Sequence, residues 1–572
     1  MASNGMSGAD AIVVGAGLGG LSAAAYLAAV GKRVILLEKY SALGGSSHVF
    51  QRRGRWEFDC GVHYVGECGD DGAVTTVMRG LGLDDRIEWL PLDESGFDRI
   101  IGPGFELATP VGWDAYLTNL HKSFPDEPRA VRRFHSVMRK LGESVDRFDT
   151  AGSARGHGQW LIKAGTAAPF AAMPYGAFLA MCGFSGRAVL ALSVQCGALA
   201  TTPATVPTAM MAGFLQDYVG AGAYYPRGGG QMLAAGFAEV ITTHGGQIRT
   251  HSDVSRIVIE GNAVVGVELA DGQRVHAPVV VSDVDVIKTF TDLVGLDRLP
   301  AWHRNRVRRW KMSKPVVTGF FGLDYDTGAY PNSNFFSIPN WDDAGSLWSL
   351  SKMAGQLIGG RGFDDGAEWA RALAARQPMY VQSSSRRDPS NGRAAPVGSS
   401  TVEVQTITPA DPRLWGVHGY DIDSGEYRGD ARYSEIKKIV VDGMLERMEQ
   451  AFPGSSAKVT IAELGTPATQ TRFVGNTGGA PFGLELRFTQ SGLLRPRSHT
   501  PVSGLLLTGT STAWGPGTVG SMISGVHAAS AATGRDLASE IRGGTVLADP
   551  TRFSAWPDDF DPLAATRSFT VK

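Results

Sequence analysis

Cysteine is scarce in this chain of 572 residues and occurs only as Cys60, Cys68, Cys182 and Cys196. Four cysteines cannot form a disulfide framework for so long a chain, and the absence of a Cys-x-x-Cys pair argues against structural zinc. We therefore expect no metal site and a reducing compartment, the cytoplasm. The first ten residues are small and polar, without the basic segment of a secretory signal.

Neither sign of charge is in surplus. The chain has 54 Lys and Arg against 56 Asp and Glu, which gives a formal net charge of −2. Binding to nucleic acid through phosphate contacts needs a basic surplus or a clustered basic face, so we expect no nucleic-acid partner. Hydrophobic residues at 43% and charged residues at 19% are close to globular averages and exclude wholesale disorder.

Charge is almost absent from residues 164–216, where Arg187 is the only charged residue. The stretch is interrupted by Pro169, Pro174, Pro203 and Pro207. Neither half therefore forms a clean membrane-spanning helix. Two interpretations stay open: an apolar helical lid over a cavity, and a monotopic surface through which an apolar molecule enters from a bilayer.

Glycine is abundant, and the first cluster of glycines follows a buried strand. Ala11–Val14 is a short apolar run, typical of a parallel strand. The sequence Gly15-Ala16-Gly17-Leu18-Gly19-Gly20 comes next, followed by residues 21–29 with helix-forming composition. A second apolar run at 33–37 ends at Glu38. The order is strand, glycine turn, helix, strand and acid.

Each part of this order has a role in binding a dinucleotide. Gly15 permits the tight turn, Gly17 lets the backbone approach a pyrophosphate, and Gly20 lets the helix pack on the strand. The amide groups at the helix start, around Leu18, bind the phosphate anion. Glu38, with Lys39 beside it, stands where an acid accepts hydrogen bonds from the adenosine ribose. The glycines Gly44 and Gly45 with Ser46 favour FAD over NAD, because they suit a backbone that runs beside a longer cofactor.

Two further blocks carry a resemblance to a known family. Residues 43–50 (LGGSSHVF) and 58–67 (FDCGVHYVGE) resemble the retinol saturase family and the wider group of phytoene desaturases and carotenoid cis–trans isomerases. Further pieces occur in family order at 95–98, 124–127, 225–230, 464–467, 478–483, 493–496 and 504–509. The resemblance covers roughly residues 10–540 and is strongest at the two ends.

The resemblance implies an FAD site built from separated segments. It places the first block along the pyrophosphate, the second block beside the flavin ring, and the backbone of Val254 at the adenine. The C-terminal region 504–525 reads as strand, glycine loop and helix. The residues expected at the flavin there are Gly509, Thr510, Gly517, Thr518 and Val519. Many relatives have Asp where this chain has Thr510.

We expect an α/β fold with a glutathione-reductase-like, Rossmann-type FAD-binding domain assembled from residues 8–75, 225–290 and 490–545. Residues 76–224 and 291–489 are expected to form a substrate domain with a β-sheet floor and the helical lid, followed by a tail at 546–572. The segments 316–324, 379–383 and 401–408 are the predicted floor.

The expected activity is saturation or desaturation of a C=C bond in a hydrophobic isoprenoid or polyene substrate, with His63 and Tyr64 as candidate catalytic residues. One alternative is a redox-neutral, FAD-dependent carotenoid isomerase, and another is a non-catalytic prenyl or lipid escort protein. The electron partner is open, and peripheral membrane contact is possible. The basic runs at 52–55 and 304–314 are interpreted as solvated faces, or as contacts to anionic lipid headgroups or to a substrate carboxylate.

Overall fold

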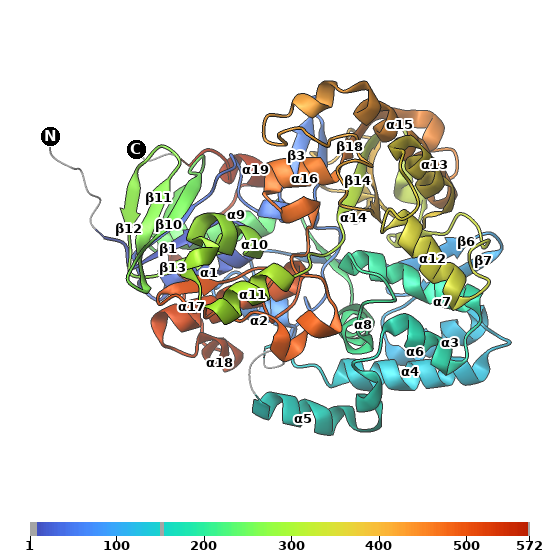
Figure 1. The fold of residues 1–572 in the computed structure, drawn as a ribbon, viewed down its shortest axis with the longest axis horizontal. Helices are drawn as coiled ribbons and strands as arrows, with labels where there is room; N and C mark the ends of the chain where they lie inside the picture. Colours follow the sequence, from blue (N-terminus) through green and yellow to red (C-terminus); the bar gives the residue numbers. More distant parts are fainter. Residues whose placement is uncertain (1–7, 149–153, 570–572) are drawn as a thin grey trace.

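Two large β-sheets organise the chain, one on the left and one on the right of Figure 1. The computed structural model describes residues 8–148 and 154–569. Helices from distant parts of the chain cover both sheets. The fold is therefore an α/β fold of two parts.

The left-hand sheet has five parallel strands in the order β19-β13-β1-β2-β9. Its strands are β1 (Ala11–Val14), β2 (Val34–Leu37), β9 (Gln247–Arg249), β13 (Val280–Ser282) and β19 (Leu505–Leu507). Three distant stretches of chain thus meet in one sheet. Because the carboxyl ends of parallel strands share one edge, the loops after β1, β2, β13 and β19 also meet there.

Alternate residues of these strands face opposite layers. Val13 and Leu36 pack on the helices α1 (Leu18–Ala29), α9 (Gln231–Thr243) and α17 (Gly517–Thr533). Ile12 and Ile35 pack on an antiparallel sheet of β10 (Val254–Glu260), β11 (Ala263–Leu269) and β12 (Arg274–His276). Both faces of the parallel sheet are therefore buried, as its apolar sequence requires.

The right-hand sheet has seven strands in the order β18-β14-β17-β16-β15-β6-β7. Its strands are β6 (Asp98–Gly102), β7 (Phe105–Thr109), β14 (Val316–Leu323), β15 (Asn334–Ser337), β16 (Met379–Gln382), β17 (Ser400–Ile407) and β18 (Val459–Gly465). The three segments predicted as the floor are adjacent strands, β14, β17 and β16. Helix α15 (Ala431–Ala451) contacts the sheet.

The charge-poor region forms α6 (Tyr175–Cys182), α7 (Gly186–Ser193) and α8 (Thr208–Leu215). Most of its apolar side chains are buried in the core shared with the seven-stranded sheet. Its most exposed large apolar side chain is Met181, at 39%. In residues 8–148 and 154–569, no helix combines the length and the apolar character needed to cross a bilayer.

The remaining elements connect and cover the two sheets. Two short pairs are β3 (Val49–Arg52) with β4 (Trp56–Asp59), and β5 (Trp89–Pro91) with β8 (Tyr224–Pro226). The other helices are α2 (Ala73–Arg79), α3 (Trp113–Ser123), α4 (Pro128–Glu143), α5 (Ala154–Ala164), α10 (Val286–Lys288), α11 (Ala301–Arg309), α12 (Leu347–Leu357), α13 (Gly366–Arg376), α14 (Ser384–Arg387), α16 (Pro467–Val474), α18 (Leu537–Arg542) and α19 (Pro562–Ala565).

Candidate functional site

One cavity of about 710 Å³ extends from the carboxyl edge of the parallel sheet to the face of the seven-stranded sheet. This volume is within the range of sites that hold cofactors and small ligands. Of the predicted cofactor-binding residues, the following line it: Gly15, Gly17, Leu18, Glu38, Lys39, Gly44, Gly45, Ser46, Val254, Gly509, Thr510, Gly517, Thr518 and Val519. Gly20 does not line it. His63 and Tyr64 lie on the wall of the same cavity.

The first glycine loop has the backbone that its sequence predicts. Gly15 adopts φ +95°, a conformation that side chains rarely tolerate. Gly20 lies behind the loop, where a Cβ atom would stand 2.1 Å from the carbonyl oxygen of Gly15. Gly20 thus brings α1 against β1 and leaves the first turn of α1 beside the cavity.

Glu38, at the end of β2, accepts hydrogen bonds from two backbone amides. Its Oε2 accepts from Ala16 N at 2.8 Å and its Oε1 from Tyr40 N at 2.7 Å. Burial raises the pKa of Glu38, and these amide hydrogen bonds oppose that shift. The carboxylate is held at the cavity wall, where it can accept further hydrogen bonds from ribose hydroxyls.

Asp283 is a cavity residue that none of the sequence motifs indicated. It follows β13 directly, and its partly buried side chain lies between the first glycine loop and Gly509. Burial raises its pKa to about 7, and the carboxylate of Glu38 adds to that shift, whereas backbone hydrogen bonds from Gly20 and Gly17 lower it. The one available signal was its position at the carboxyl end of a parallel strand.

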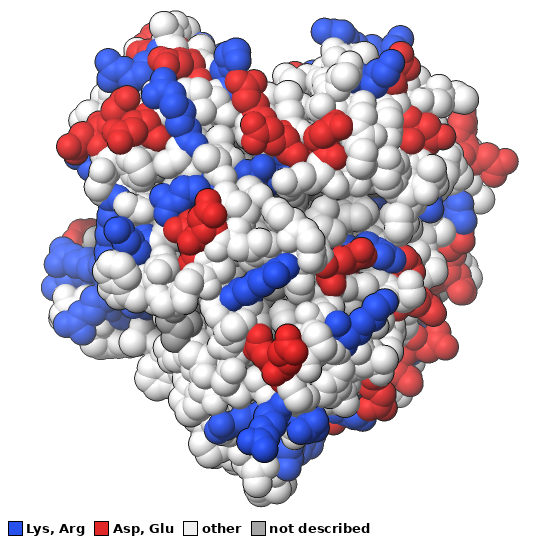
Figure 2. Space-filling model, turned by 90° about the vertical axis from the view of Figure 1, so that its right-hand side faces the viewer, with Lys and Arg blue, Asp and Glu red and all other residues white. Residues whose placement is uncertain are grey.

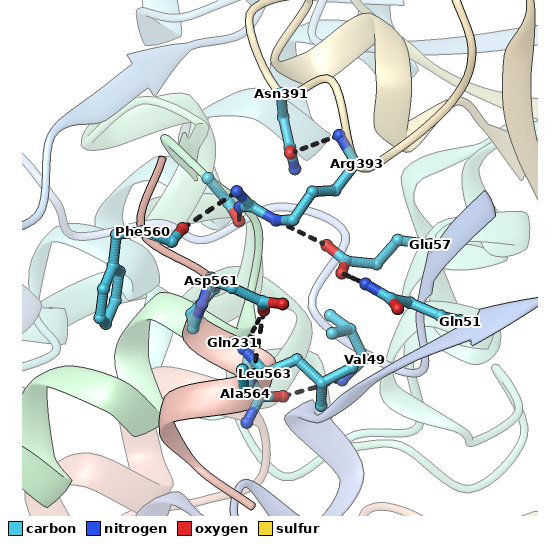
Figure 3. A network of polar contacts seen from close by, with 12 residues as sticks. Val49, Gln51, Glu57, Gln231, Asn391, Arg393, Phe560, Asp561, Leu563 and Ala564 are labelled. Atoms are coloured by element: carbon cyan, nitrogen blue, oxygen red, sulfur yellow. Dashed lines mark hydrogen bonds and ion pairs between the residues drawn. The ribbon is translucent and has the colours of Figure 1, made fainter. Parts of the chain in front are cut away.

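The second glycine loop, residues 43–47, is held from behind by Gln231. The Nε2 atom of Gln231 donates to Leu43 O at 2.9 Å and to Thr566 Oγ1 at 2.7 Å. Its Oε1 atom accepts from Val49 N at 2.9 Å. Figure 3 shows Gln231 between β3 and the C-terminal segment.

The C-terminal segment adds its own contacts to this loop. Leu43 N donates to Thr566 O at 3.0 Å, and Leu563 packs with Ala42 and Val49. Arg393 Nη1 donates to Phe560 O at 3.0 Å, as Figure 3 shows. The residues after 550 therefore support a loop that lines the cavity.

At the other end of the site, α17 begins at Gly517 and follows a glycine turn. Gly515 and Gly517 adopt φ +93° and +85°. Arg495 is buried, and its guanidinium donates to Thr510 O at 2.7 Å and to Thr512 O at 2.8 Å. No sequence pattern indicated Arg495, which fixes the loop that contains Thr510.

Together these features fit a bound FAD. The first turns of α1 and α17 have amide groups that the helices themselves do not use, and both turns line the cavity. Gly44 and Gly45, with φ +115° and +54°, bring the backbone to the cavity wall between them. Glu38 supplies the acceptor expected at the adenosine ribose. Anion-binding amides and a ribose-binding acid are the groups that a flavin dinucleotide needs.

His63 lies where the two parts of the fold meet. Gln382 Nε2 is 3.1 Å from its Nδ1 atom, and Gln405 Nε2 is 2.8 Å from its Nε2 atom. Burial lowers the pKa of His63 to about 3. The imidazole is therefore neutral at physiological pH and is fixed by an amide side chain on each side.

Tyr64 lies in a group of aromatic rings with Tyr218 and Tyr380. Its ring centroid is 4.4 Å from that of Tyr218 and 6.4 Å from that of Tyr380, on which it stacks. The Tyr380 hydroxyl donates to Asn334 Oδ1 at 2.6 Å. The Tyr64 hydroxyl is buried and has no hydrogen-bond partner among the described residues. The described part of the protein therefore leaves the hydrogen-bonding capacity of this hydroxyl unused.

The cavity wall also has an apolar part, which we call the apolar arm and in which the ring centroid of Phe336 lies 5.3 Å from that of Tyr380. The side chains on this part of its wall are Leu190, Val194, Phe336, Leu350, Met353, Ile358 and Ile407. They come from α7, the seven-stranded sheet and the region of α12, so the floor and two helices enclose this arm.

The fold and the site define a two-part flavoprotein with a dinucleotide-binding domain and a separate β-floored domain. A family model described as flavin containing amine oxidoreductase matches residues 18–327, more than half of the chain. The chain belongs to this family and is an FAD-dependent oxidoreductase.

Named relatives and a solved structure match the chain over most of its length. The chain is 24% identical over 542 residues to all-trans-retinol 13,14-reductase of Danio rerio, covering 87% of this chain and 82% of the relative. It is 25% identical over 530 residues to prolycopene isomerase 1, chloroplastic, of an Oncidium hybrid cultivar, covering 91% and 83%. A structure of putrescine oxidase bound to putrescine matches with a TM-score of 0.59 and 14% identity, covering 92% of this chain and all of that chain (100%). The last comparison shows the fold alone.

Proposed function

We propose that this oxidoreductase saturates or desaturates a C=C bond of a hydrophobic isoprenoid or polyene. The observation that carries the proposal is the continuity of the cavity, which leads from the dinucleotide loops past His63 and Tyr64 into an apolar arm. A long apolar chain fits such an arm, and its burial there is favourable because apolar surface leaves water. The names of the relatives, a retinol reductase and a prolycopene isomerase, support the same substrate class.

The chemistry divides between the cofactor and the chain. Bound FAD supplies the two-electron exchange with the substrate. The apolar arm positions the C=C bond and excludes water. Tyr64, whose buried hydroxyl has no partner among the described residues, is proposed to hold the proton that one carbon of the bond gains or loses. His63, being neutral, is proposed to position Gln405 and the flavin-side wall and not to transfer a proton.

A redox-neutral cis–trans isomerisation is the second candidate, because a prolycopene isomerase aligns with 91% of the chain. It would use the same cavity without a net transfer of electrons. A lipid escort function is the third candidate. The glycine loops, Glu38 and Arg495 argue against it, because an escort protein has no need for a complete dinucleotide site.

The test is a visible spectrum of the purified protein, followed by anaerobic reduction with dithionite and addition of all-trans-retinol or a carotenoid. We expect a flavin band that dithionite bleaches. If the reaction is saturation, the polyene restores the band of the reduced protein, and if it is desaturation, the polyene bleaches the band of the oxidised protein without dithionite. Mass spectrometry of the extracted polyene then separates the candidates, since saturation adds two hydrogens, desaturation removes two, and isomerisation changes only the retention time. A protein that shows no flavin band, even after FAD is supplied, would contradict both enzymatic candidates and support the escort function.

A further inference from the structure

The helix α11 and the loop at residues 487–494 form a surface that the proposed reaction does not use. We call it the basic–apolar surface. Its exposed apolar side chains are Trp302 at 62%, Phe488 at 60%, Leu493 at 45% and Leu494 at 51%. Its basic residues are Arg304, Arg306, Arg308, Arg309, Lys311 and Arg487. Large apolar side chains rarely gather on the surface of a protein unless they contact a partner.

Hydrogen bonds hold the two segments together. Arg306 Nη2 donates to Leu494 O at 2.6 Å. Lys311 N donates to Gln490 Oε1 at 2.7 Å, and Gln490 Nε2 donates back to Lys311 O at 2.9 Å. The apolar side chains of the loop therefore stay beside the arginines of α11, and the surface is a fixed feature of the fold.

The charge of this surface has one sign. Residues 298–314 contain seven Lys and Arg and no Asp or Glu, in a chain whose net charge is −2. Within the part of the chain that the structure describes, none of the α11 arginines forms an ion pair. The adjacent Glu485 is buried and lies 3.7 Å from Lys314 and 3.6 Å from Arg487. The positive charge on α11 is thus left uncompensated.

The face of the molecule that contains α12 differs from the basic–apolar surface in its charge. The face that contains α12 has Lys and Arg side chains interspersed with Asp and Glu, as Figure 2 shows. Trp348 on α12 is even more exposed than Trp302, at 73%, and the Nζ atom of Lys352 lies 5.5 Å from the centroid of its ring. It has no comparable cluster of arginines on its helix, whose only basic residue is Lys352. An exposed tryptophan alone is therefore not the distinguishing feature.

A short segment connects the basic–apolar surface to the wall of the cavity. Ser313 N donates to Gly483 O at 2.7 Å, and Lys314 N donates to Ala200 O at 2.8 Å. Val316, Phe482 and Gly483 line the cavity. The surface thus continues directly into the wall of the apolar arm.

We propose that the basic–apolar surface docks on a membrane that contains anionic phospholipid. Trp302, Phe488, Leu493 and Leu494 insert at the headgroup level, and the arginines of α11 bind the headgroup phosphates. A nucleic acid would use the same arginines but has no use for four exposed apolar side chains, which is why the lipid surface is favoured. The proposal does not depend on which polyene reaction the cavity performs.

The test is flotation of the full-length protein with vesicles of phosphatidylcholine, alone or mixed with phosphatidylglycerol. We expect binding to the mixed vesicles that weakens at high salt, because exposed charges are screened. The triple variant Arg304→Gln, Arg308→Gln and Arg309→Gln should bind about 100-fold more weakly. The double variant Trp302→Ser and Phe488→Ser should also lose binding, whereas Trp348→Ser, the matched control, should keep it. Circular dichroism checks that each variant is folded.

Three results would overturn the proposal. The first is equal binding to both kinds of vesicle. The second is unchanged binding by the triple or the double variant, or a loss with Trp348→Ser as large as with the double variant. The third is binding of duplex DNA, by the wild type and by the double variant, as tight as the binding of the wild type to the mixed vesicles, which would assign the surface to a nucleic acid.

Discussion

The carboxyl group of Asp283 reaches into the turn at Gly17, where a Cβ atom would stand 2.4 Å from its Oδ2 atom. An acid at the centre of an anion-binding loop has consequences for the cofactor. When Asp283 is protonated the loop attracts a pyrophosphate, and when it is ionised the two negative charges repel each other.

This relationship predicts that FAD affinity depends on pH. The pKa of Asp283 is raised from 3.8 to about 7 in the folded protein, and bound pyrophosphate would raise it further. FAD binding should therefore take up a proton above pH 7, and affinity should fall by up to about tenfold for each pH unit. In Asp283→Asn, whose amide oxygen can still accept from Gly20 N, this fall should disappear. Flavin fluorescence titrations at pH 6 and pH 9 measure it, and equal pH dependence in variant and wild type would refute the prediction.

The raised pKa of Asp283 also makes the stability of the folded protein depend on pH. A carboxyl group whose pKa is raised on folding contributes most to the free energy of unfolding when the pH lies below its unfolded pKa, near 4. That contribution is lost as the pH rises to about 7. Asp59 is also raised to about 7 by burial. Between pH 4 and pH 7, Asp283→Asn and Asp59→Asn should each show a shallower decline in the free energy of unfolding than the wild type. Denaturant titrations across that range measure this decline. A decline as steep in the variants as in the wild type would contradict the prediction.

A third prediction concerns the contact between the C-terminal segment and the second glycine loop. Thr566→Val removes one of the two acceptors of Gln231 Nε2, and the loss of this buried hydrogen bond costs about 1–3 kcal/mol. We expect weaker FAD binding, by about tenfold, together with a lower free energy of unfolding. Thr551→Val is the matched control, because Thr551 is exposed and bonds only within its own turn. If both variants hold FAD like the wild type, the loop does not need this support.

Much of the site could be predicted because its chemistry is local in sequence. The turn at Gly15 and the acid at Glu38 are each encoded within a few residues of a strand. Asp283, Gln231 and Arg495 were missed because their roles arise only from tertiary contacts. Gln231 and Thr566, for example, are 335 residues apart. No local pattern indicates that such residues meet.

A fourth prediction separates the role of His63 from that of Tyr64. Burial lowers the pKa of His63 to about 3, so this residue stays neutral between pH 5 and pH 8. The pH profile of kcat should therefore show no ionisation of His63 in that range. Tyr64→Phe removes the buried hydroxyl and should lower kcat by about 10²-fold or more with little change in KM. Tyr380→Phe is its control, since the Tyr380 hydroxyl already bonds Asn334. A Tyr64→Phe enzyme with full kcat would remove the proton-holding role from this residue.

The last prediction concerns Gly20, which shapes the site without lining it. In Gly20→Ala the new methyl group would stand 2.1 Å from Gly15 O and 3.0 Å from the Asp283 Cβ atom. Because α1 and β1 are both buried, the helix must move away from the strand, at a cost of about 1–3 kcal/mol or more. The first turn of α1 moves with it, so flavin retention during purification should fall. Gly158→Ala in α5 is the matched control: no described atom lies within 4 Å of that position, and alanine favours a helix. A loss of stability in Gly20→Ala with full retention of flavin would show that the loop geometry tolerates the displacement of α1.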